Sequence, residues 1–499
     1  MWRLNLHLAT YRMHPPTDII GRKEEREMLL RALRTPRSEL IALFGRRRIG
    51  KTFLVRNLYR YHIRLEWSGM YKGTLKDQLR NFYMALSAKR NKPPVPSDWM
   101  EAFAQLSEYL DSPATSSAKG TRRKSKAAKK VVFIDEFPWL DSRRSRFLPA
   151  FSNWWNSYAS KRDDLVVVIC GSAAAYMIRK VINDKGGLHN RVTQRIRLAP
   201  FNLRETELLL QRNKVRLTRY DILQLYMALG GVPHYLQLVE AGESVAQAID
   251  RLCFDRNGYL RGEFGNVFAS LFEHSANHES VVRALSSVRR GLTRNAIAKH
   301  GKLASGGRLT ATLTELEQSG FIEHYTPYDG KKDPLYRVTD EYTQFYLRYI
   351  EGSKPAQRGV WSKLSTTPAH RAWAGFAFET ICMKHVEEIK EALRIGGIRS
   401  VEGSWIGKGD ESGAQVDLLI DRDDNVINLC EMKFSATPFR IDKKYAAGLA
   451  AKVRAFTSKT RTRKSVFVTF VTTYGVEGNA YSTQLVQNEL EMDALFEDI

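Results

Sequence analysis

Cysteine is scarce in this chain, and no cysteines have the spacing of a bound metal. The four residues of this type stand far apart, with neither a CxxC pair nor a Cys/His pairing: Cys170, Cys253, Cys382 and Cys430. A zinc site and a disulfide framework are therefore not indicated. This usage fits a reducing compartment, so we expect a cytoplasmic protein.

Long apolar runs and an excess of acid are also missing. The first residues, MWRLNLHLATYRMHPP, contain no stretch typical of a secretory signal, and no run approaches the ~20 apolar residues of a membrane span. We expect no membrane association. Lys and Arg outnumber Asp and Glu by 78 to 54, giving a net charge of +24. This balance favours a polyanionic partner, with nucleic acid as the leading candidate. A highly charged surface that only aids solubility is the alternative, and net charge alone leaves the two interpretations about even.

The 499 residues are too many for one hydrophobic core, and about three or four domains are expected. SELIALFGRRRIGKTFLVR (38–56) predicts a buried strand, a glycine-bounded loop and a helix. KVVFIDEFPWL and DLVVVICGS predict two more buried strands, separated by the helical stretch SRFLPAFSNWWNSYAS. Strands that alternate with helices imply a parallel sheet covered on both faces.

The loop after the first strand has the pattern GxxxxGK[ST] of a phosphate-binding loop. The glycines allow backbone N–H groups to face phosphates, the lysine reaches the β and γ oxygens, and the threonine holds Mg²⁺. The sequence therefore predicts that ATP and Mg²⁺ are bound here. The predicted nucleotide ligands are Gly45, Arg46, Arg47, Arg48, Ile49, Gly50, Lys51 and Thr52.

Two later strands end in polar side chains that suit the same site. VVFIDEF places Asp135 where it can hold magnesium and Glu136 where it can polarise an attacking water. Ser172, at the end of VVVICGSA, is expected either to sense the γ-phosphate or to cap the following helix. An acid next to the aspartate favours ATP hydrolysis over nucleotide binding alone.

The middle of the chain predicts helices and then a winged helix-turn-helix. Residues 203–274 read as a helical lid, and 275–352 as three short helices followed by a two-stranded wing. GRLTATLTELEQSG is the recognition-helix candidate, with Arg308 on it and Lys331 and Lys332 at the wing tip. DNA is the favoured partner, although such modules also bind proteins.

The C-terminal segment contains a candidate metal-dependent nuclease site. Asp417 lies in one apolar strand, a DRDDN turn follows, and the next strand ends with Glu431 and Lys433 on one face. The ExK pattern is common, and a second copy spans Glu388 to Lys390 in a helical stretch. The nine basic residues among positions 440–464, with one acid, favour the first copy because they suit a phosphate backbone.

Together, IIGRKEEREML, GRRRIGKT, VVFIDEF, ICGSAAAYM, GGVPHYL and YRVTDEYTQFYLRYI resemble the archaeal-type ATPase family, a STAND-like AAA+ group of the MNS clade. The resemblance covers about residues 19–499. It implies an α/β multidomain protein with a P-loop AAA+-like parallel sheet, a helical lid, a winged helix and a restriction-endonuclease-like, PD-(D/E)xK domain.

The resemblance also implies roles for individual residues. Pro233 matches the lid motif near the nucleotide base, and Glu379 matches the N-terminal helical acid that would hold the nuclease metal with Asp417 and Glu431. Arg191 occupies the place of a catalytic arginine finger, although Asn190 replaces the glycine that usually precedes it. A finger supplied by a neighbour would make the protein a homo-oligomer.

The domains implied are an N-terminal extension (1–20), an ATPase core (21–202) with a basic insert (about 112–130), the lid (203–274), the winged helix (275–352) and the nuclease-like domain (361–499). We expect an ATP-hydrolysing, DNA-associated protein whose Mg²⁺- or Mn²⁺-dependent nuclease is regulated by nucleotide, with a role in defence or mobile elements. The alternatives are a switch that binds DNA or protein without cutting, and an ATPase that acts on proteins.

Overall fold

The computed structural model describes residues 19–89, 93–112, 128–288, 290–328, 333–354, 359–407 and 415–498. The first 18 residues, most of the basic insert, and Lys331 and Lys332 lie outside these ranges. The chain forms two compact units. The first contains the residues up to Phe44, Gly50–Ser172 and Tyr176–Leu198, and the second contains Gly45–Ile49, Ala173–Ala175 and Ala199–Ile499.

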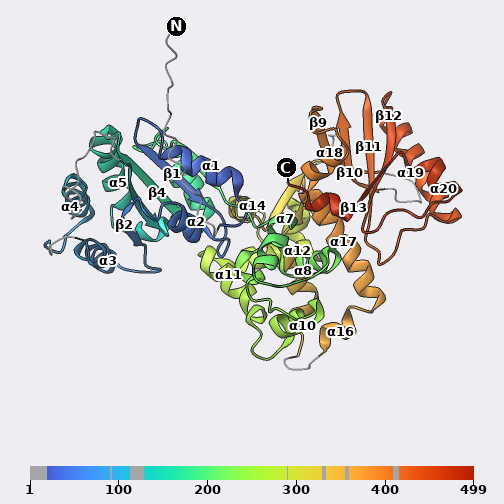
Figure 1. Ribbon diagram of the computed structural model, residues 1–499, viewed down its shortest axis with the longest axis horizontal. Helices are drawn as coiled ribbons and strands as arrows, with labels where there is room; N and C mark the ends of the chain where they lie inside the picture. The colour runs from blue at the N-terminus through green and yellow to red at the C-terminus, as the bar shows by residue number, and fades with distance from the viewer. Residues whose placement is uncertain are drawn as a thin grey trace, which may run out of the picture. The chain divides into compact units, whose positions relative to one another are not determined.

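The first unit is built on a parallel five-stranded sheet in the order β2-β3-β4-β1-β5, drawn in blue to teal in Figure 1. The central strands are buried along almost their whole length because helices cover both faces. Its elements are α1 (Lys23–Ala32), β1 (Glu39–Phe44), α2 (Lys51–Leu58), β2 (Ile63–Ser68), α3 (Leu75–Ser87), α4 (Trp99–Asp111), β3 (Lys130–Asp135), α5 (Phe147–Ser157), β4 (Leu165–Gly171), α6 (Ala174–Tyr176) and β5 (Gln194–Arg197).

The three strands predicted for this sheet are confirmed, and two further strands were missed. β2 and β5 lie at the two edges of the sheet, where only some of their side chains are buried. Their mixed sequences, IRLEWS and QRIR, lack the continuous apolar run that identifies a central strand. The apolar FPWL after Asp135 forms a short 3₁₀ turn and does not prolong β3.

The second unit begins with the helices predicted as a lid. The first of them starts at an Asn202 cap, whose side chain accepts from the Glu205 N–H, and the Glu205 carboxylate accepts from the Asn202 N–H. These helices are α7 (Leu203–Arg212), α8 (Arg219–Leu229), α9 (Pro233–Leu236), α10 (Val245–Ile249) and α11 (Glu263–Leu271).

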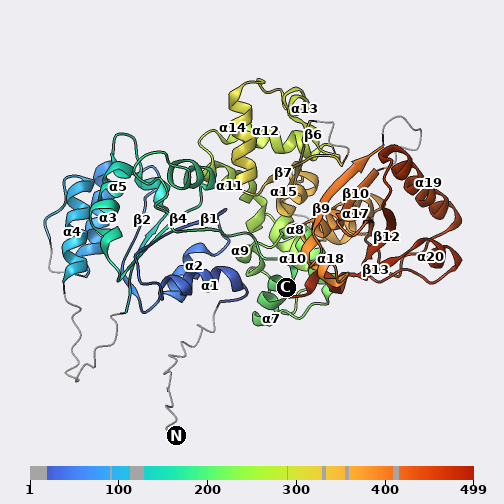
Figure 2. The same cartoon turned by 90° about the horizontal axis from the view of Figure 1, so that it is seen from above.

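Three helices and a small antiparallel sheet follow; besides the two strands predicted as a wing, the sheet contains a short third strand between the first two helices, which was not predicted. Leu309, Leu313 and Leu316 form the buried face of α14, as expected from their spacing. Figure 2 shows these helices gathered beside β6 and β7. The elements are α12 (Ser275–Ser286), β6 (Leu292–Thr293), α13 (Arg294–His300), α14 (Gly307–Gln318), β7 (Ile322–Tyr325), β8 (Leu335–Val338) and α15 (Glu341–Phe345).

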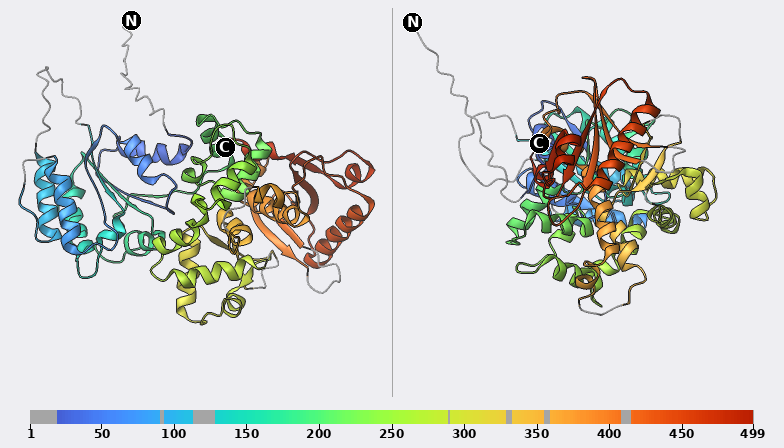
Figure 3. Two further views of the ribbon diagram at one scale, coloured as in Figure 1. Left: turned by 90° about the horizontal axis from the view of Figure 1, so that it is seen from below. Right: turned by 90° about the vertical axis from the view of Figure 1, so that its right-hand side faces the viewer.

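The C-terminal part carries a mixed five-stranded sheet in the order β13-β12-β11-β10-β9. β9, β10 and β11 are antiparallel neighbours, whereas β12 runs parallel to β11 after a crossover through α19, drawn in dark red in Figure 3. The elements are α16 (Val360–Leu364), α17 (Pro368–Lys384), α18 (Val386–Ala392), β9 (Ser400–Ile406), β10 (Gln415–Arg422), β11 (Val426–Lys433), α19 (Lys443–Thr460), β12 (Ser465–Thr472), α20 (Ala480–Leu485) and β13 (Asn488–Glu491).

Alternation along β11 divides its side chains between two helices. Phe456 of α19 packs with Leu429 in one core cluster, while α17 packs against β11 from the side that carries Cys430. The ring of Tyr220 on α8 stacks on Phe434 at 5.2 Å, just beyond the end of β11. Within the described ranges, no helix combines the length and the apolar character needed to cross a bilayer.

A buried histidine joins the lid to α17. The Nε2 atom of His385 accepts from the Leu203 N–H at 3.1 Å, and its Nδ1 lies 2.8 Å from the Ile381 carbonyl oxygen. This pairing requires a neutral ring that carries its proton on Nδ1. Burial is the main cause that lowers the pKa of His385 from its ordinary value to about 4.

We therefore expect acid to destabilise the second unit through His385. A lowered folded-state pKa stabilises the fold above the ordinary pKa of about 6.5, and this contribution is lost as the pH falls toward about 4. At pH 5 the loss should reach about 2 kcal/mol. Urea midpoints at pH 7.5 and pH 5 test this: the drop should be clearly smaller in His385→Asn. An equal drop in both proteins would contradict the assignment.

Candidate functional site

The predicted phosphate loop lies between the end of β1 and the start of α2. Gly45 and Gly50 have φ of +148° and +88°, and a Cβ on Gly50 would meet no atom within 4 Å. The backbone conformation at Gly50, not lack of space, therefore calls for glycine. Lys51, 6% exposed, is the first residue of α2, and the N-terminal end of a helix favours a bound anion.

The predicted magnesium ligands of the first unit lie together. The Thr52 hydroxyl donates to Asp135 Oδ2 at 2.7 Å, although the two residues are 83 positions apart in the sequence. Thr52 is the second residue of α2 and Asp135 ends β3, so both stand at the carboxyl edge of the parallel sheet. A hydroxyl and a carboxylate in contact are the groups that hold Mg²⁺ on a nucleotide in P-loop proteins, so the pair fits that ion.

Glu136, the acid next to Asp135, is hydrogen-bonded by Ser172, which follows the neighbouring strand β4. The Ser172 hydroxyl donates to Glu136 Oε1 at 2.7 Å, and the Ser172 N–H lies 3.3 Å from Oε2. β3 and β4 pair in register up to Ile134 and Ile169, which brings the residues that follow them side by side. Ser172 therefore orients the carboxylate of Glu136. The backbone of Glu136 adopts the left-handed conformation, with a φ of +44°.

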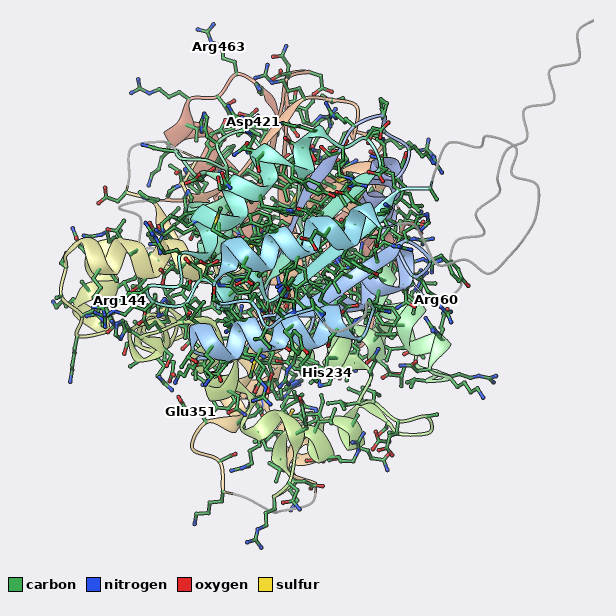
Figure 4. The ribbon with its side chains drawn as sticks, turned by 90° about the vertical axis from the view of Figure 1, so that its left-hand side faces the viewer. Arg60, Arg144, His234, Glu351, Asp421 and Arg463 are labelled. Carbon is green, nitrogen blue, oxygen red and sulfur yellow. The ribbon has the colours of Figure 1, made fainter. Side chains whose placement is uncertain are left out.

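Pro233 and Arg191 have different surroundings. Pro233 is buried at the first position of α9, and the next N–H, that of His234, lies 3.4 Å from the Arg48 carbonyl oxygen. His234, labelled in Figure 4, also contacts the Tyr259 hydroxyl at 2.9 Å. The lid motif thus touches the part of the phosphate loop that belongs to the second unit. Arg191 is exposed in the turn before β5.

The arginines of the phosphate loop direct their side chains to acids of the second unit. Arg46 donates to Asp340 Oδ1, and both residues are 3% exposed. Arg48 lies 2.6 Å from Glu263 Oε1 and 5.1 Å from the centre of the Tyr259 ring. These guanidinium groups are engaged by acids, so the backbone is the part of both residues that faces a phosphate most readily.

Asp340 and Glu341 were not predicted as functional residues. Asp340 Oδ2 accepts from the Thr343 N–H and hydroxyl, so this residue caps α15 while it pairs with Arg46. Burial would raise the pKa of Asp340, but Arg46 and these bonds hold it below the ordinary value. Glu341 binds Lys384 of α17 at 2.6 Å. The only local sign in the sequence is TDEYT, an N-cap pattern.

The D…ExK residues of the C-terminal sheet are also brought together. Register pairs Leu418 with Cys430, so Asp417 and Glu431 are the next opposed positions of the two strands. Glu431 is 5% exposed, and Lys433 Nζ lies 3.3 Å from its Oε2. The antiparallel pairing of β10 and β11 agrees with the hairpin expected from the sequence, and the joint role of the three residues stays a prediction.

Two residues of α19 complete this cluster. The Tyr445 hydroxyl donates to Glu431 Oε2 at 2.9 Å, and Lys452 Nζ donates to Oε1. Burial opposes ionisation of Glu431, but Lys433 and Lys452 lower its pKa below the ordinary value. The sequence indicated α19 only as a basic helix. No local sequence pattern reveals that the residues 14 and 21 positions after Glu431 contact it.

Glu379 approaches the cluster from α17. Burial, followed by the negative charge of Asp417, raises the pKa of its carboxyl to about 8. Carboxylate oxygens are suitable ligands for Mg²⁺ or Mn²⁺. However, among the residues that the structure describes, no three His, Cys, Asp or Glu side chains form a group able to hold an ion. Glu431 is directed toward lysines.

A pocket of about 510 Å³ opens beside Glu431 and α19. Its walls combine basic and acidic side chains with a bare helix backbone, and the Tyr445 ring borders it. The lining residues are Glu431, Lys433, Asp442, Lys444, Tyr445, Gly448, Leu449, Ala451 and Lys452.

Residues 20–239 match the model of a family described as an ATPase domain predominantly from Archaea. This part of the chain is therefore similar to an archaeal-type ATPase domain. The chain is 24% identical over 422 residues to the uncharacterised protein MJECL04 of Methanocaldococcus jannaschii, a match that covers 81% of this chain and 85% of the relative.

Two solved structures are similar over part of the chain. The Walker-type ATPase PABY2304 of Pyrococcus abyssi gives a TM-score of 0.49 at 18% identity, covering 66% of this chain and 96% of its own. The ORC2 protein of Aeropyrum pernix gives a TM-score of 0.41 at 13% identity, covering 68% and 95%.

Glu136→Gln should bind ATP normally and hydrolyse it at least about 100-fold more slowly, because an amide cannot accept a proton from water. Nucleotide binding by calorimetry and phosphate release at saturating ATP separate the two effects. Glu66→Gln, on the edge strand β2, is the matched control and should behave as wild type. Hydrolysis at the wild-type rate in Glu136→Gln would contradict the role given to this acid.

Proposed function

We propose that this protein binds and hydrolyses ATP and that its nucleotide state controls a C-terminal domain that acts on DNA, with a metal-dependent nuclease site. The observation that carries the ATPase part is two hydrogen bonds at one edge of the sheet: Thr52 donates to Asp135, and Ser172 donates to Glu136. The first bond joins two side chains suited to hold Mg²⁺, and the second orients an acid beside the end of the phosphate loop.

Each group of this first site has a distinct task in the proposal. The loop backbone and Lys51 would hold the phosphates, and Thr52 and Asp135 would hold Mg²⁺, which would supply neutralisation of the phosphate charge. Glu136 accepts a proton from the attacking water while Ser172 keeps its carboxylate in place. Arg191 is exposed and so is available to a neighbouring copy as an arginine finger, which would make hydrolysis depend on homo-oligomer formation.

The second site is proposed to cut DNA. Glu379, Asp417 and Glu431 would hold Mg²⁺ or Mn²⁺, which supplies Lewis-acid activation of the phosphodiester, and Lys433 would bind the reacting phosphate. DNA is supported by the net charge of +24 and by exposed basic groups. Among them are Arg308 on α14 and Arg463, which extends outward after α19 (Figure 4).

Control by nucleotide is supported by two ion pairs whose acids are buried. Arg46 of the phosphate loop binds Asp340, the adjacent Glu341 binds Lys384, and Lys384 ends α17, the helix that carries Glu379. A nucleotide that shifts the loop backbone must move Arg46 together with Asp340 or leave that acid buried without its partner. Either outcome reaches α17 through α15.

A second function is favoured by one observation. Oε2 of Glu431 accepts from the Tyr445 hydroxyl and lies 3.3 Å from Lys433 Nζ, and Oε1 accepts from Lys452, so the acid is already neutralised without a metal. The protein would then be an ATP-gated switch that holds DNA or protein without cleaving it. Cleavage assays separate the two functions.

Cleavage is expected to require Glu431. Wild type is incubated with Mg²⁺ or Mn²⁺ and labelled single- and double-stranded DNA and RNA, with and without ATP. Glu431→Ala should lose at least about 100-fold in rate, since a metal site without this ligand no longer stabilises the transition state. Glu477→Ala, an exposed acid of the same domain, should retain activity. Equal cutting by Glu431→Ala overturns the site, and no cutting by wild type supports the switch.

The Arg46–Asp340 pair is expected to be strongly non-additive. Asp340→Asn or Arg46→Met alone leaves one buried charge unpaired and should cost about 3–5 kcal/mol, measured by urea unfolding. The double variant leaves no buried charge without its partner, so its loss of unfolding free energy should be smaller than the sum of the two single losses.

The same double variant tests the coupling. DNA affinity measured with and without a non-hydrolysable ATP analogue should differ in wild type and become equal in the double variant, while ATP binding persists. Additive stability losses, or an unchanged response to nucleotide, would refute the proposed control.

A further inference from the structure

The chain that follows β7 leaves the module formed by residues 275–352 and joins the C-terminal sheet (Figure 2). Pro327 forms a parallel bridge with Ser404 of β9, and the Tyr328 N–H donates to the Ser404 carbonyl oxygen at 2.7 Å. β9 stands at the edge of its sheet, where a strand offers N–H and C=O groups to a further strand. Pro327 and Tyr328 therefore add to that edge as a short strand does.

The side chain of Tyr328 is built into the same sheet. Its ring lies 5.7 Å from the Phe456 ring and packs against the buried cluster between α19, β10 and β11. Its hydroxyl donates to Asp421 Oδ2 on β10 at 2.8 Å. Burial and this bond raise the pKa of Tyr328 to about 12, so the hydroxyl remains a donor at neutral pH. A Cβ on Gly403 of β9 would lie 3.9 Å from the Tyr328 Cβ, so a larger side chain there would press on the ring.

A second surface of the module has the charge that nucleic acid needs. Positions 290–314, which include α13 and the first part of α14, contain five Lys or Arg residues and no Asp or Glu. The side chains of Lys299, Lys302 and Arg308 are exposed on this stretch. A basic surface without acids favours a phosphate backbone, because each neutralised phosphate releases counterions.

Arg294 braces the two helices of this surface. Its Nε donates to the Thr310 hydroxyl at 3.1 Å, its Nη1 donates to the Ser305 hydroxyl at 3.1 Å, and its Nη2 donates to the Gly306 carbonyl oxygen at 2.9 Å. The start of α14 is thereby fixed against α13. The two helices form one basic face, which we call the α13–α14 face (Lys299, Lys302 and Arg308).

We propose that Pro327 and Tyr328 dock the module on the C-terminal sheet and that nucleic acid meets the module through the α13–α14 face. The docked residues are committed to β9 and β10, so they hold the basic face in a fixed position beside the C-terminal sheet and do not grip nucleic acid themselves. The nucleic-acid half rests on the proposed DNA association, whereas the docking half does not.

Urea unfolding of the full chain tests the docking half. Tyr328→Phe and Asp421→Ala, alone and combined, should be coupled: the combined loss should fall short of the sum by at least about threefold in the unfolding constant. Lys464, the other partner of Asp421, is unchanged in all four proteins, so its effect cancels. Tyr325→Phe is the matched control, because its hydroxyl donates to the Arg290 carbonyl oxygen within the module. It should be additive with Asp421→Ala. Additive losses for Tyr328→Phe overturn the docking.

The salt dependence of DNA binding tests the nucleic-acid half. Each duplex phosphate that the protein neutralises adds about 0.9 to the slope of log affinity against log salt. With a short labelled duplex in EDTA, Lys299→Met and Arg308→Met should each lower this slope by about 0.9 and weaken binding. Lys363→Met, at an exposed lysine of α16, is the matched control and should keep the wild-type slope. Tyr328→Phe should keep both the slope and the affinity of wild type.

The opposite results are distinct. A lower slope or weaker binding in Tyr328→Phe would mean that the docked residues contact DNA, and tighter binding would mean that docking competes with DNA; either overturns the proposal. Wild-type slopes in Lys299→Met and Arg308→Met overturn the assigned face. Failure of the proposed DNA association looks different, because wild type would then bind no duplex while the coupling of Tyr328 with Asp421 remained.

Discussion

The second unit depends on the buried ion pair between Arg46 and Asp340. Burying two charges is favourable only when each has its partner, and here both residues are 3% exposed. Asp340 also caps α15, so the pair fixes the start of that helix and the first half of the phosphate loop at once. The phosphate loop is therefore anchored by the side chain of Arg46, at a position where the GxxxxGK[ST] motif allows any residue.

The next residue extends this constraint toward the C-terminal sheet. Glu341 is as buried as its neighbour and reaches Lys384, which stands one position before the buried His385. His385 in turn holds the first N–H of α7. Helices from the lid, the segment 275–352 and the C-terminal part thus meet at charged or polar contacts that tolerate little displacement, because each would leave a buried group without its partner.

The two acidic sites of the chain differ in what their carboxylates touch. Asp135 and Glu136 accept from the hydroxyls of Thr52 and Ser172, which bring no positive charge and can remain beside a metal. Glu431 accepts from Lys452 and has Lys433 close by, so ammonium groups surround it. The carboxylates therefore lie beside neutral hydroxyls at one site and beside positive charges at the other.

The sequence by itself determined the parts whose pattern is local. The order strand, glycine loop and helix, the acids that end β3, and the alternation that places Glu431 and Lys433 on one face all follow from short spacings, and the structure has them. The edge strands β2 and β5 were not predicted, because they are only partly buried and so lack a continuous apolar sequence. Tertiary structure alone decided the partners: Asp340 lies 294 positions from Arg46, and Lys452 faces Glu431 from a helix. No periodicity encodes such pairs, because they exist only once the chain has packed.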